Sequence, residues 1–400
     1  MKKTNSIKPE PKRGYKRYSL SLTGENSHVF DLQLGQGSLS IGTKGVSEGK
    51  YDIWVEPEDT INWDSFNECY TYYGERQKEE HPFGDWPRWI YYSGMDTGFI
   101  EWTSKRKTES FNWTPTEDVS VDMRNVDINE LTLNLYKHIN ITVGSKIKML
   151  ILGGNPENAD VKTCGKAPDM VFALKEYENP DNVYRIPICE ELQDTEFVGI
   201  ELSPVGDVFD CECLKQFKHV KNLNIWGNVR NTSVLSDLSE LETIGMRYIP
   251  DMSGFPDVRI WKNLKRFIGW NIEETAGKNL RKELKALEKE KEIEYHISQL
   301  RSKTWFATEY DNPFKNWEGS KGKKASKLYK DYLKEIKKVP GEASVKERII
   351  SFTQGFNAFD DLDTVEREDV YDAIRRLIMA SPFEIDESIW LKWFDNTRDF

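Results

Sequence analysis

One spacing of apolar residues returns several times in the middle of this chain and constrains its fold more than any other feature. In residues 217–228, FKHVKNLNIWGN, apolar side chains and a final asparagine follow the pattern L-x-x-L-x-L-x-x-N. The spacing returns in full at 147–155, with isoleucine in the last place at 241–249, and loosely at 264–272. A unit of this length cannot bury its apolar side alone, so successive units stack and each adds a strand to an open, curved surface. Such a surface is typical of proteins that hold another protein.

The second apolar position of each strand serves as a marker for the repeat. The markers are Leu152, Leu174, Ile200, Ile225, Met246 and Gly269. They are separated by about 22, 26, 25, 21 and 23 residues, within the range of about 20–29 that such repeats use. Leu131 and Leu133 mark an earlier unit, and the irregular stretch 156–195 indicates an insertion.

Composition limits the class of protein. Four hundred residues predict two or three domains. The net charge of −11 argues against general affinity for nucleic acid. Five cysteines, an odd number, favour free thiols in a reducing compartment. There is no signal peptide and no apolar run of the ~20 residues that a membrane span needs, so we expect a soluble cytoplasmic protein without membrane contact.

Changes of pattern along the chain predict an α+β multidomain protein in which a curved parallel sheet lies between a β-rich and an α-helical domain. Alternating apolar residues dominate the first part, where 99–113 is expected to form a hairpin. After the repeats, Leu280, Leu284 and Leu287 predict a one-sided helix that caps the last strand, and EGSKGKKAS (318–326) indicates a linker. The expected segments are a flexible tail (1–13), a β-rich domain (14–114), a repeat domain (115–275), a capping helix with linker (276–320) and an α-helical domain (321–400).

Within the last segment, Asp363 and Glu366 form a capping pair that predicts the start of a helix. The lysine-rich stretch 321–338 has two interpretations, a basic patch for an acidic partner or nucleic acid, and a solvated helix face.

The repeat motifs resemble those of leucine-rich repeat proteins, in particular the short, irregular arrays of bacterial proteins. The resemblance covers about residues 130–275 and is strongest at 147–155 and 220–228. It departs from the family where Ile249 and Ile272 replace the asparagine that normally bonds to the turn between repeats. The family implies a solenoid with a concave binding face. The alternative interpretation is an ordinary α/β domain with buried strands.

The resemblance also implies which side chains face a partner. Leucine positions of each strand point into the core, and the residues between them point outward. The residue after each marker is Gly153, Lys175, Glu201, Trp226, Arg247 or Trp270. The predicted partner-binding set is Trp226, Arg247 and Trp270 in one row, flanked by Tyr248, Asn224, Glu201 and Asn271. Tryptophan, tyrosine and arginine are enriched at interface hot spots. Alternatively, Trp226 and Trp270 are core residues covered by a neighbouring domain.

Residues 356–374, FNAFDDLDTVEREDVYDAI, resemble segments of bacterial immunity proteins that are paired with secreted toxins. This likeness implies a protein partner, a toxin, that the chain neutralises by covering its functional surface. We expect no small-molecule substrate, no cofactor and no enzymatic activity.

Metal and catalytic motifs are weak in this sequence. Cys211, Cys213, His219 and Cys189 lack the paired C-x-x-C spacing of zinc motifs, and buried free cysteines are the commoner interpretation. No H-E-x-x-H or G-x-G-x-x-G motif occurs.

The alternative function is a hydrolase or toxin-type enzyme with its active site in the β-rich domain. His81, Asp85, Trp86 and Arg88 are close enough in sequence to line a pocket there.

Overall fold

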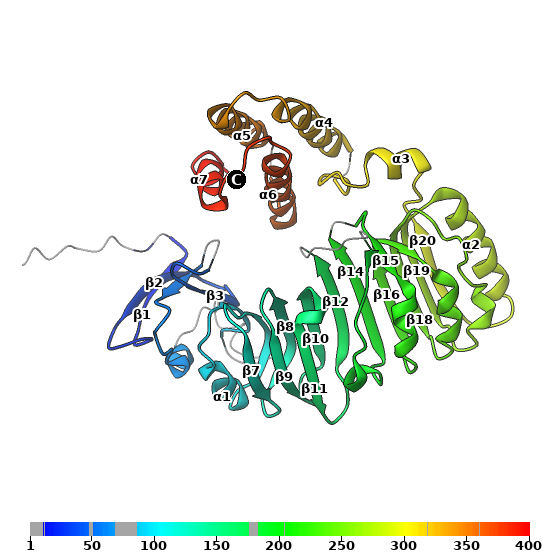
Figure 1. The fold of residues 1–400 in the computed structure, drawn as a ribbon, viewed down its shortest axis with the longest axis horizontal. Helices are drawn as coiled ribbons and strands as arrows, with labels where there is room; N and C mark the ends of the chain where they lie inside the picture. Colours follow the sequence, from blue (N-terminus) through cyan, green and yellow to red (C-terminus); the bar gives the residue numbers. More distant parts are fainter. Residues whose placement is uncertain are drawn as a thin grey trace, which may run out of the picture. The chain divides into compact units, whose positions relative to one another are not determined.

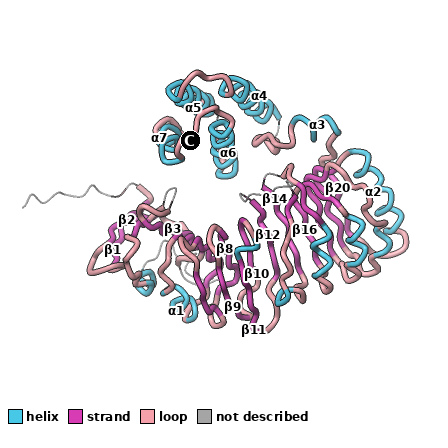
Figure 2. Tube along the Cα trace, viewed as in Figure 1, coloured by secondary structure: helices cyan, strands magenta, loops and turns pink. Residues whose placement is uncertain are grey.

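The computed structural model describes residues 11, 13–47, 51–68, 86–175, 183–203, 205–317, 319–359 and 361–400. The chain forms two compact units, Met1–Arg301 and Ser302–Phe400, each of which is described by itself. Strands dominate the first unit and helices the second, as Figures 1 and 2 show. Among the described residues no helix has the length and apolar character that a membrane span needs.

Strands supply most of the first unit. Its strands are β1 (Tyr15–Leu20), β2 (His28–Gln33), β3 (Ser38–Thr43), β4 (Ile53–Val55), β5 (Trp89–Ser93), β6 (Thr108–Thr114), β7 (Val119–Met123), β8 (Ile128–Leu135), β9 (Ile139–Gly144), β10 (Met149–Gly154), β11 (Ala159–Cys164), β12 (Asp169–Lys175), β13 (Val183–Tyr184), β14 (Phe197–Ser203), β15 (Val208–Asp210), β16 (Asn222–Trp226), β17 (Asn228–Arg230), β18 (Thr243–Ile249), β19 (Arg266–Ile272) and β20 (Glu294–Ser298). Its helices are α1 (Gly98–Ser104) and α2 (Glu274–Leu287), with short 3-10 turns η1 (Trp63–Glu68), η3 (Pro156–Asn158), η4 (Glu190–Leu192), η5 (Cys211–Gln216), η6 (Thr232–Asp237) and η7 (Val258–Ile260).

Twelve strands form one open parallel sheet. Their order is β20-β19-β18-β16-β14-β12-β10-β8-β6-β5-β3-β4, so β20 and β4 are its edges. Two short parallel sheets, β11-β9-β7 and β13-β15-β17, are built from the strands that alternate with those of the large sheet along the chain. In Figure 1, β7, β9 and β11 lie below β8 and β10 of the large sheet. The protein is therefore a mixed α/β protein with a large parallel sheet.

A column of buried side chains runs across the large sheet and holds its strands in register. Its central members, aligned strand by strand, are Trp113, Leu133, Leu152, Phe172, Ile200, Ile225 and Met246. The marker expected at Leu174 is wrong by two residues, because Phe172 pairs with Ile200 and Leu174 pairs with Leu202. Met170, Phe172 and Leu174 are all buried, so alternation alone could not fix the register of this strand.

The large sheet continues across the boundary expected at 114/115. Strand β6, which ends at Thr114, pairs directly with β8, and Trp113 lies beside Leu133. Trp113 is fully buried and donates a hydrogen bond from Nε1 to the carbonyl oxygen of Gly94 at 2.9 Å. The first strands of the chain and the repeats therefore share one core, and the boundary in the structure falls at 301/302.

The hairpin expected at residues 99–113 is wrong, because helix α1 precedes strand β6 there. Phe99, Trp102 and Thr103 are the buried residues of α1. Their spacing of three and four residues is typical of a helix. The aromatic content of this segment alone did not distinguish a helix from a strand.

The capping helix expected after the repeats corresponds to α2, which buries Leu280, Leu284 and Leu287. The sheet does not end beneath it, because β20 follows and pairs with β19. Helix α2 and strand β20 thus complete one more strand–helix–strand crossover.

The second unit is helical. Its helices are α3 (Lys303–Thr308), α4 (Gly319–Ile336), α5 (Glu342–Asn357), α6 (Thr364–Met379) and α7 (Glu387–Asp395). The capping pair predicted at Asp363 and Glu366 is confirmed at the start of α6. The linker expected at 318–326 is wrong, because α4 begins at Gly319. Gly322 and Ala325 are buried on one side of α4, and its lysines supply the polar side.

Candidate protein-interaction site

The parallel register places three of the predicted binding residues side by side. Trp226 of β16 lies beside Arg247 of β18, and Arg247 lies beside Trp270 of β19. Glu201 of β14 precedes Trp226 in the same row. Because neighbouring strands are about 4.8 Å apart, these four side chains form a continuous strip across the sheet, called here the indole row.

The indole row is accessible to solvent. The Trp226 side chain is 38% exposed, and Arg247 and Trp270 are half-buried. The guanidinium carbon of Arg247 lies 4.7 Å from the centroid of the Trp226 ring, a cation–π contact. Among the described residues, no carboxylate lies within ion-pair distance of Arg247, so its N–H donors are not committed to a charged partner.

Tyr248 and Asn271 do not flank the row at the surface as predicted, because each directly follows an outward side chain, Arg247 or Trp270, and alternation turns the next side chain inward. Both are buried, and both adopt left-handed backbone conformations with φ of 62° and 54°. Gly227, at the aligned position after Trp226, has a φ of 126°. A left-handed residue interrupts the alternation, so Ile249 and Ile272, one position further along, are buried as well.

One of these buried residues packs against the indole row, and the other bonds to a residue outside it. The Tyr248 ring packs edge-on against Trp270 with a centroid distance of 5.2 Å. The side-chain oxygen of Asn271 accepts a hydrogen bond from Nε of Arg301 at 2.7 Å. Asn271 Nδ2 is buried without a hydrogen-bond partner. Both predicted binding residues are therefore buried, and neither is available at the surface beside the row.

Glu201 and Asn224 lie at the accessible surface. The crowded surface desolvates the carboxyl group and raises the pKa of Glu201 above its ordinary value, while the positive charge of Arg247 acts in the opposite direction. Asn224 is half-buried and occupies the space left by Gly245, where a β-carbon would lie 2.1 Å from the Asn224 oxygen. Gly245 thus allows the amide to lie across the sheet.

The row loses its large side chains in both directions. Toward β10 its members are Ala173 and Gly153, because Ala173 and not Lys175 aligns with Glu201. Toward the other edge, Ser298 of β20 aligns with Trp270. Sequence reasoning missed Ser298, although the alternation of residues 294–298 carried the signal for a further strand. The bulky patch is therefore confined to β14, β16, β18 and β19.

Two of the four residues proposed for an enzymatic site, Trp86 and Arg88, lie in the described part of the chain. Trp86 is buried, and Arg88 pairs with Glu109 at 3.1 Å while its guanidinium lies 4.2 Å from the Trp89 ring centroid. His81 and Asp85 lie outside the described residues.

Two of the described cysteines are held in the thiol form by burial. Burial raises the pKa of Cys189 to about 11 and that of Cys211 to about 12. Within the described residues, no cluster of histidine, cysteine and acidic side chains has the arrangement of a metal site.

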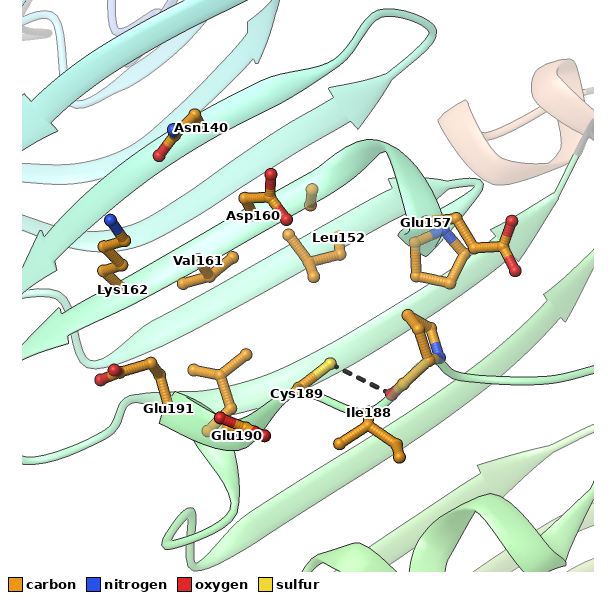
Figure 3. A pocket seen from close by; sticks show the side chains of 14 residues that line it. Asn140, Leu152, Glu157, Asp160, Val161, Lys162, Ile188, Cys189, Glu190 and Glu191 are labelled. Carbon is orange, nitrogen blue, oxygen red and sulfur yellow. Dashed lines mark hydrogen bonds between the residues drawn. The ribbon is translucent and has the colours of Figure 1, made fainter.

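A separate cavity of about 550 Å³ lies along strand β11, away from the indole row. Figure 3 shows that β11 forms one wall and residues 187–192 form the other. The lining is apolar at Leu152, Val161 and Leu192, and charged at its rim.

Comparison with known proteins adds no further guide to function. No protein-family model, curated protein or solved structure matches this chain.

Proposed function

We propose that this chain is a non-enzymatic protein-binding module whose first unit is a leucine-rich repeat solenoid. Stacked parallel strands with one buried column support this proposal, since each strand contacts only its neighbours, as in a repeat array. The partner-binding surface is the sheet face that carries the indole row.

The observation that carries the proposal is the exposed indole of Trp226 stacked against Arg247. The half-buried Arg247 side chain is already held on the Trp226 ring, so it loses little conformational entropy when a partner binds. Trp270 continues the same surface and is fixed by Tyr248. Clustered tryptophan and arginine side chains are the commonest source of hot spots, which cost at least about 2 kcal/mol when truncated.

The proposed partner is a bacterial toxin, and the chain acts as its immunity protein by steric occlusion. The resemblance of residues 356–374 to immunity proteins supports this choice. Occlusion requires an interface of about 1,200–2,000 Å², of which the indole row supplies the centre.

The test is binding between the full chain and the purified protein encoded next to it in the genome, since immunity proteins are encoded beside their toxins. We expect Trp226→Ala combined with Arg247→Ala to weaken this complex by at least about 100-fold, as two lost hot spots imply. The matched control is Tyr136→Ala with Lys137→Ala, an exposed aromatic and cation between β8 and β9.

Two outcomes would contradict the proposal. Equal affinity for the wild type and a folded Trp226→Ala/Arg247→Ala variant would exclude the indole row as the site. Failure of the neighbouring protein to bind, combined with normal growth when it is expressed without this chain, would exclude the immunity role.

A further inference from the structure

Strand β11 has a partly open edge beside the cavity; toward the end of the strand, Thr163 Oγ1 donates a hydrogen bond to the carbonyl oxygen of Glu191 in η4 at 3.4 Å. It pairs with β9 on one side and is the terminal strand of its three-stranded sheet. The next short sheet begins with β13, which pairs only with β15. The cavity along β11 thus lies where the two short sheets are interrupted. A strand edge offers a row of backbone N–H and C=O groups to another extended chain.

The opposite wall of the cavity is fixed in place. Gln216 of η5 donates a hydrogen bond to the carbonyl oxygen of Pro187 at 3.1 Å and accepts one from the Cys189 amide at 2.7 Å. Cys189 also donates from Sγ to the Pro187 carbonyl oxygen, the bond drawn in Figure 3. These bonds hold the backbone on both sides of Ile188 and leave its side chain 78% exposed at the cavity rim.

The apolar residues of β11 are incompletely covered. Ile139 and Ile141 of β9 are fully buried, whereas the aligned Ala159 and Val161 of β11 are only half-buried. The difference arises because β9 has a neighbour on both sides and β11 has one. A further strand beside β11 would cover Val161 and Ile188 together.

Negative charge predominates around the cavity. Its charged lining residues are Glu157, Asp160, Lys162, Glu190 and Glu191. Asp160 lies 3.0 Å from the His138 ring nitrogen, and no lysine or arginine in the described part of the chain lies within ion-pair distance of Glu157 or Glu190. Positive charge on a bound chain would therefore be favoured.

We infer that this cavity binds an extended, basic peptide segment of another protein, which adds as a strand to the open edge of β11. The backbone of the segment pairs with β11, its apolar side chains cover Val161 and Ile188, and its alternate lysine or arginine side chains reach Glu157 and Glu190. Residues 159–162 of β11 line the cavity, and Thr163 is already bonded to Glu191, so the paired segment is limited to about four residues. This site is separate from the indole row and does not depend on it.

The test uses a fluorescein-labelled seven-residue peptide of alternating lysine and valine, titrated with the full chain and followed by fluorescence anisotropy. We expect saturable binding with a Kd of about 10–100 μM, typical of a short strand-adding segment. Glutamate in place of lysine should weaken binding at least about 10-fold through charge repulsion. Two further peptides carry methyl groups on alternate backbone nitrogens, one at the odd positions and the other at the even positions. Methylation keeps the side chains but removes the N–H donors at those positions. The peptide whose methylated nitrogens face β11 should bind at least about 10-fold more weakly.

Variants locate the peptide on the protein. Ile188→Asp and the pair Glu157→Lys/Glu190→Lys should each reduce affinity at least about 10-fold. The matched controls Ile260→Asp, at another exposed isoleucine, and Glu292→Lys, at another exposed glutamate, should change affinity less than about 2-fold. Thermal unfolding of each variant establishes that it is folded.

Three results would overturn the inference. They are absence of saturable binding up to about 1 mM protein, equal affinity for the peptide and both of its methylated forms, and equal affinity of the wild type and the folded cavity variants. The last result would show that the basic peptide binds elsewhere on an acidic surface.

Discussion

Asp210 offers the most informative test of how neighbouring repeats are joined. Its carboxylate is 6% exposed and accepts hydrogen bonds from Arg230 Nε at 3.0 Å, Arg230 NH2 at 2.7 Å and Asn231 Nδ2 at 2.8 Å. It also accepts the Glu212 amide at 3.2 Å and so caps η5. One carboxylate therefore connects the turn of its own repeat with two residues of the next.

The cost of Asp210→Ala follows from these contacts. Loss of the cap contributes about 1 kcal/mol, and loss of the Asn231 hydrogen bond about 1 kcal/mol. The Arg230 side chain is 42% exposed, so its ion pair adds only about 0.5–1 kcal/mol after solvent screening. We expect Asp210→Ala to lower the free energy of unfolding of the first unit by about 2–3 kcal/mol. Asp210→Asn, which keeps an acceptor oxygen, should cost about 1 kcal/mol.

The stabilisation that Asp210 provides depends on pH, and its hydrogen bonds determine the direction of this dependence. Burial alone raises the pKa of Asp210, but hydrogen bonds from Asn231, Arg230 and the Glu212 amide outweigh it, and the net pKa is below its ordinary value of 3.8. The stabilisation is therefore complete above the unfolded pKa and is lost as the pH falls through the lower folded pKa. The difference between wild type and Asp210→Asn should be constant above about pH 5 and shrink in stronger acid.

Urea unfolding followed by tryptophan fluorescence measures these differences at pH 7 and along the acid range. Arg230→Ala and the Asp210→Ala/Arg230→Ala double variant complete a cycle that isolates the ion pair. A loss below about 0.5 kcal/mol for Asp210→Ala at pH 7, or the same Asp210→Asn difference at pH 3 as at pH 7, would refute the reasoning.

Two further predictions concern one close approach in the sheet and one carboxyl group in the helical unit. Gly144→Ala should destabilise the first unit by about 2–3 kcal/mol in urea unfolding, because the new β-carbon would lie 2.0 Å from the carbonyl oxygen of Arg124. The control is Gly153→Ala, whose β-carbon would lie 3.1 Å from the side-chain oxygen of Asn134 and 3.6 Å from the carbonyl oxygen of Leu133; equal costs would contradict the argument. Burial raises the pKa of Asp369 to about 6 despite the 2.8 Å hydrogen bond from Trp317, so the helical unit should lose about 1–2 kcal/mol as the pH rises from 4 to 7. Asp369→Asn should remove this slope in thermal unfolding, and a slope that persists would assign it to another group.

The sequence predicted the fold most securely where the repeat motif is complete. Ile225 and Met246 occupy aligned, buried positions, which places Trp226 beside Arg247 as the pattern implies. The strand around Phe172 was misaligned, because a shift of two residues leaves every side chain on the same face. The alternation of apolar residues identifies which face of a strand is buried, but it does not determine how the strand aligns with its neighbours.

The remaining differences have local causes that apolar spacing does not carry. Tyr248 and Asn271 have left-handed backbones, a conformation that non-glycine residues rarely adopt, so each is followed by a second buried residue, Ile249 or Ile272. Strands β5 and β6 were assigned to a separate domain because Tyr92 and Trp113 stand where the repeats carry leucine. Aromatic residues fill the same buried column, so a pattern of leucine and isoleucine alone does not include these two strands.

The uninterrupted sheet across residues 114 and 115 has a practical consequence for anyone dividing this chain. A fragment that begins at 115 would lack β6. Strand β8, from Ile128 to Leu135, would then be an edge strand with unpaired backbone groups along its whole length. Such edges recruit further copies, so this fragment should aggregate during expression. A cut between Arg301 and Ser302 severs no strand pairing, and it yields two pieces that can each be purified and assayed for its own partner.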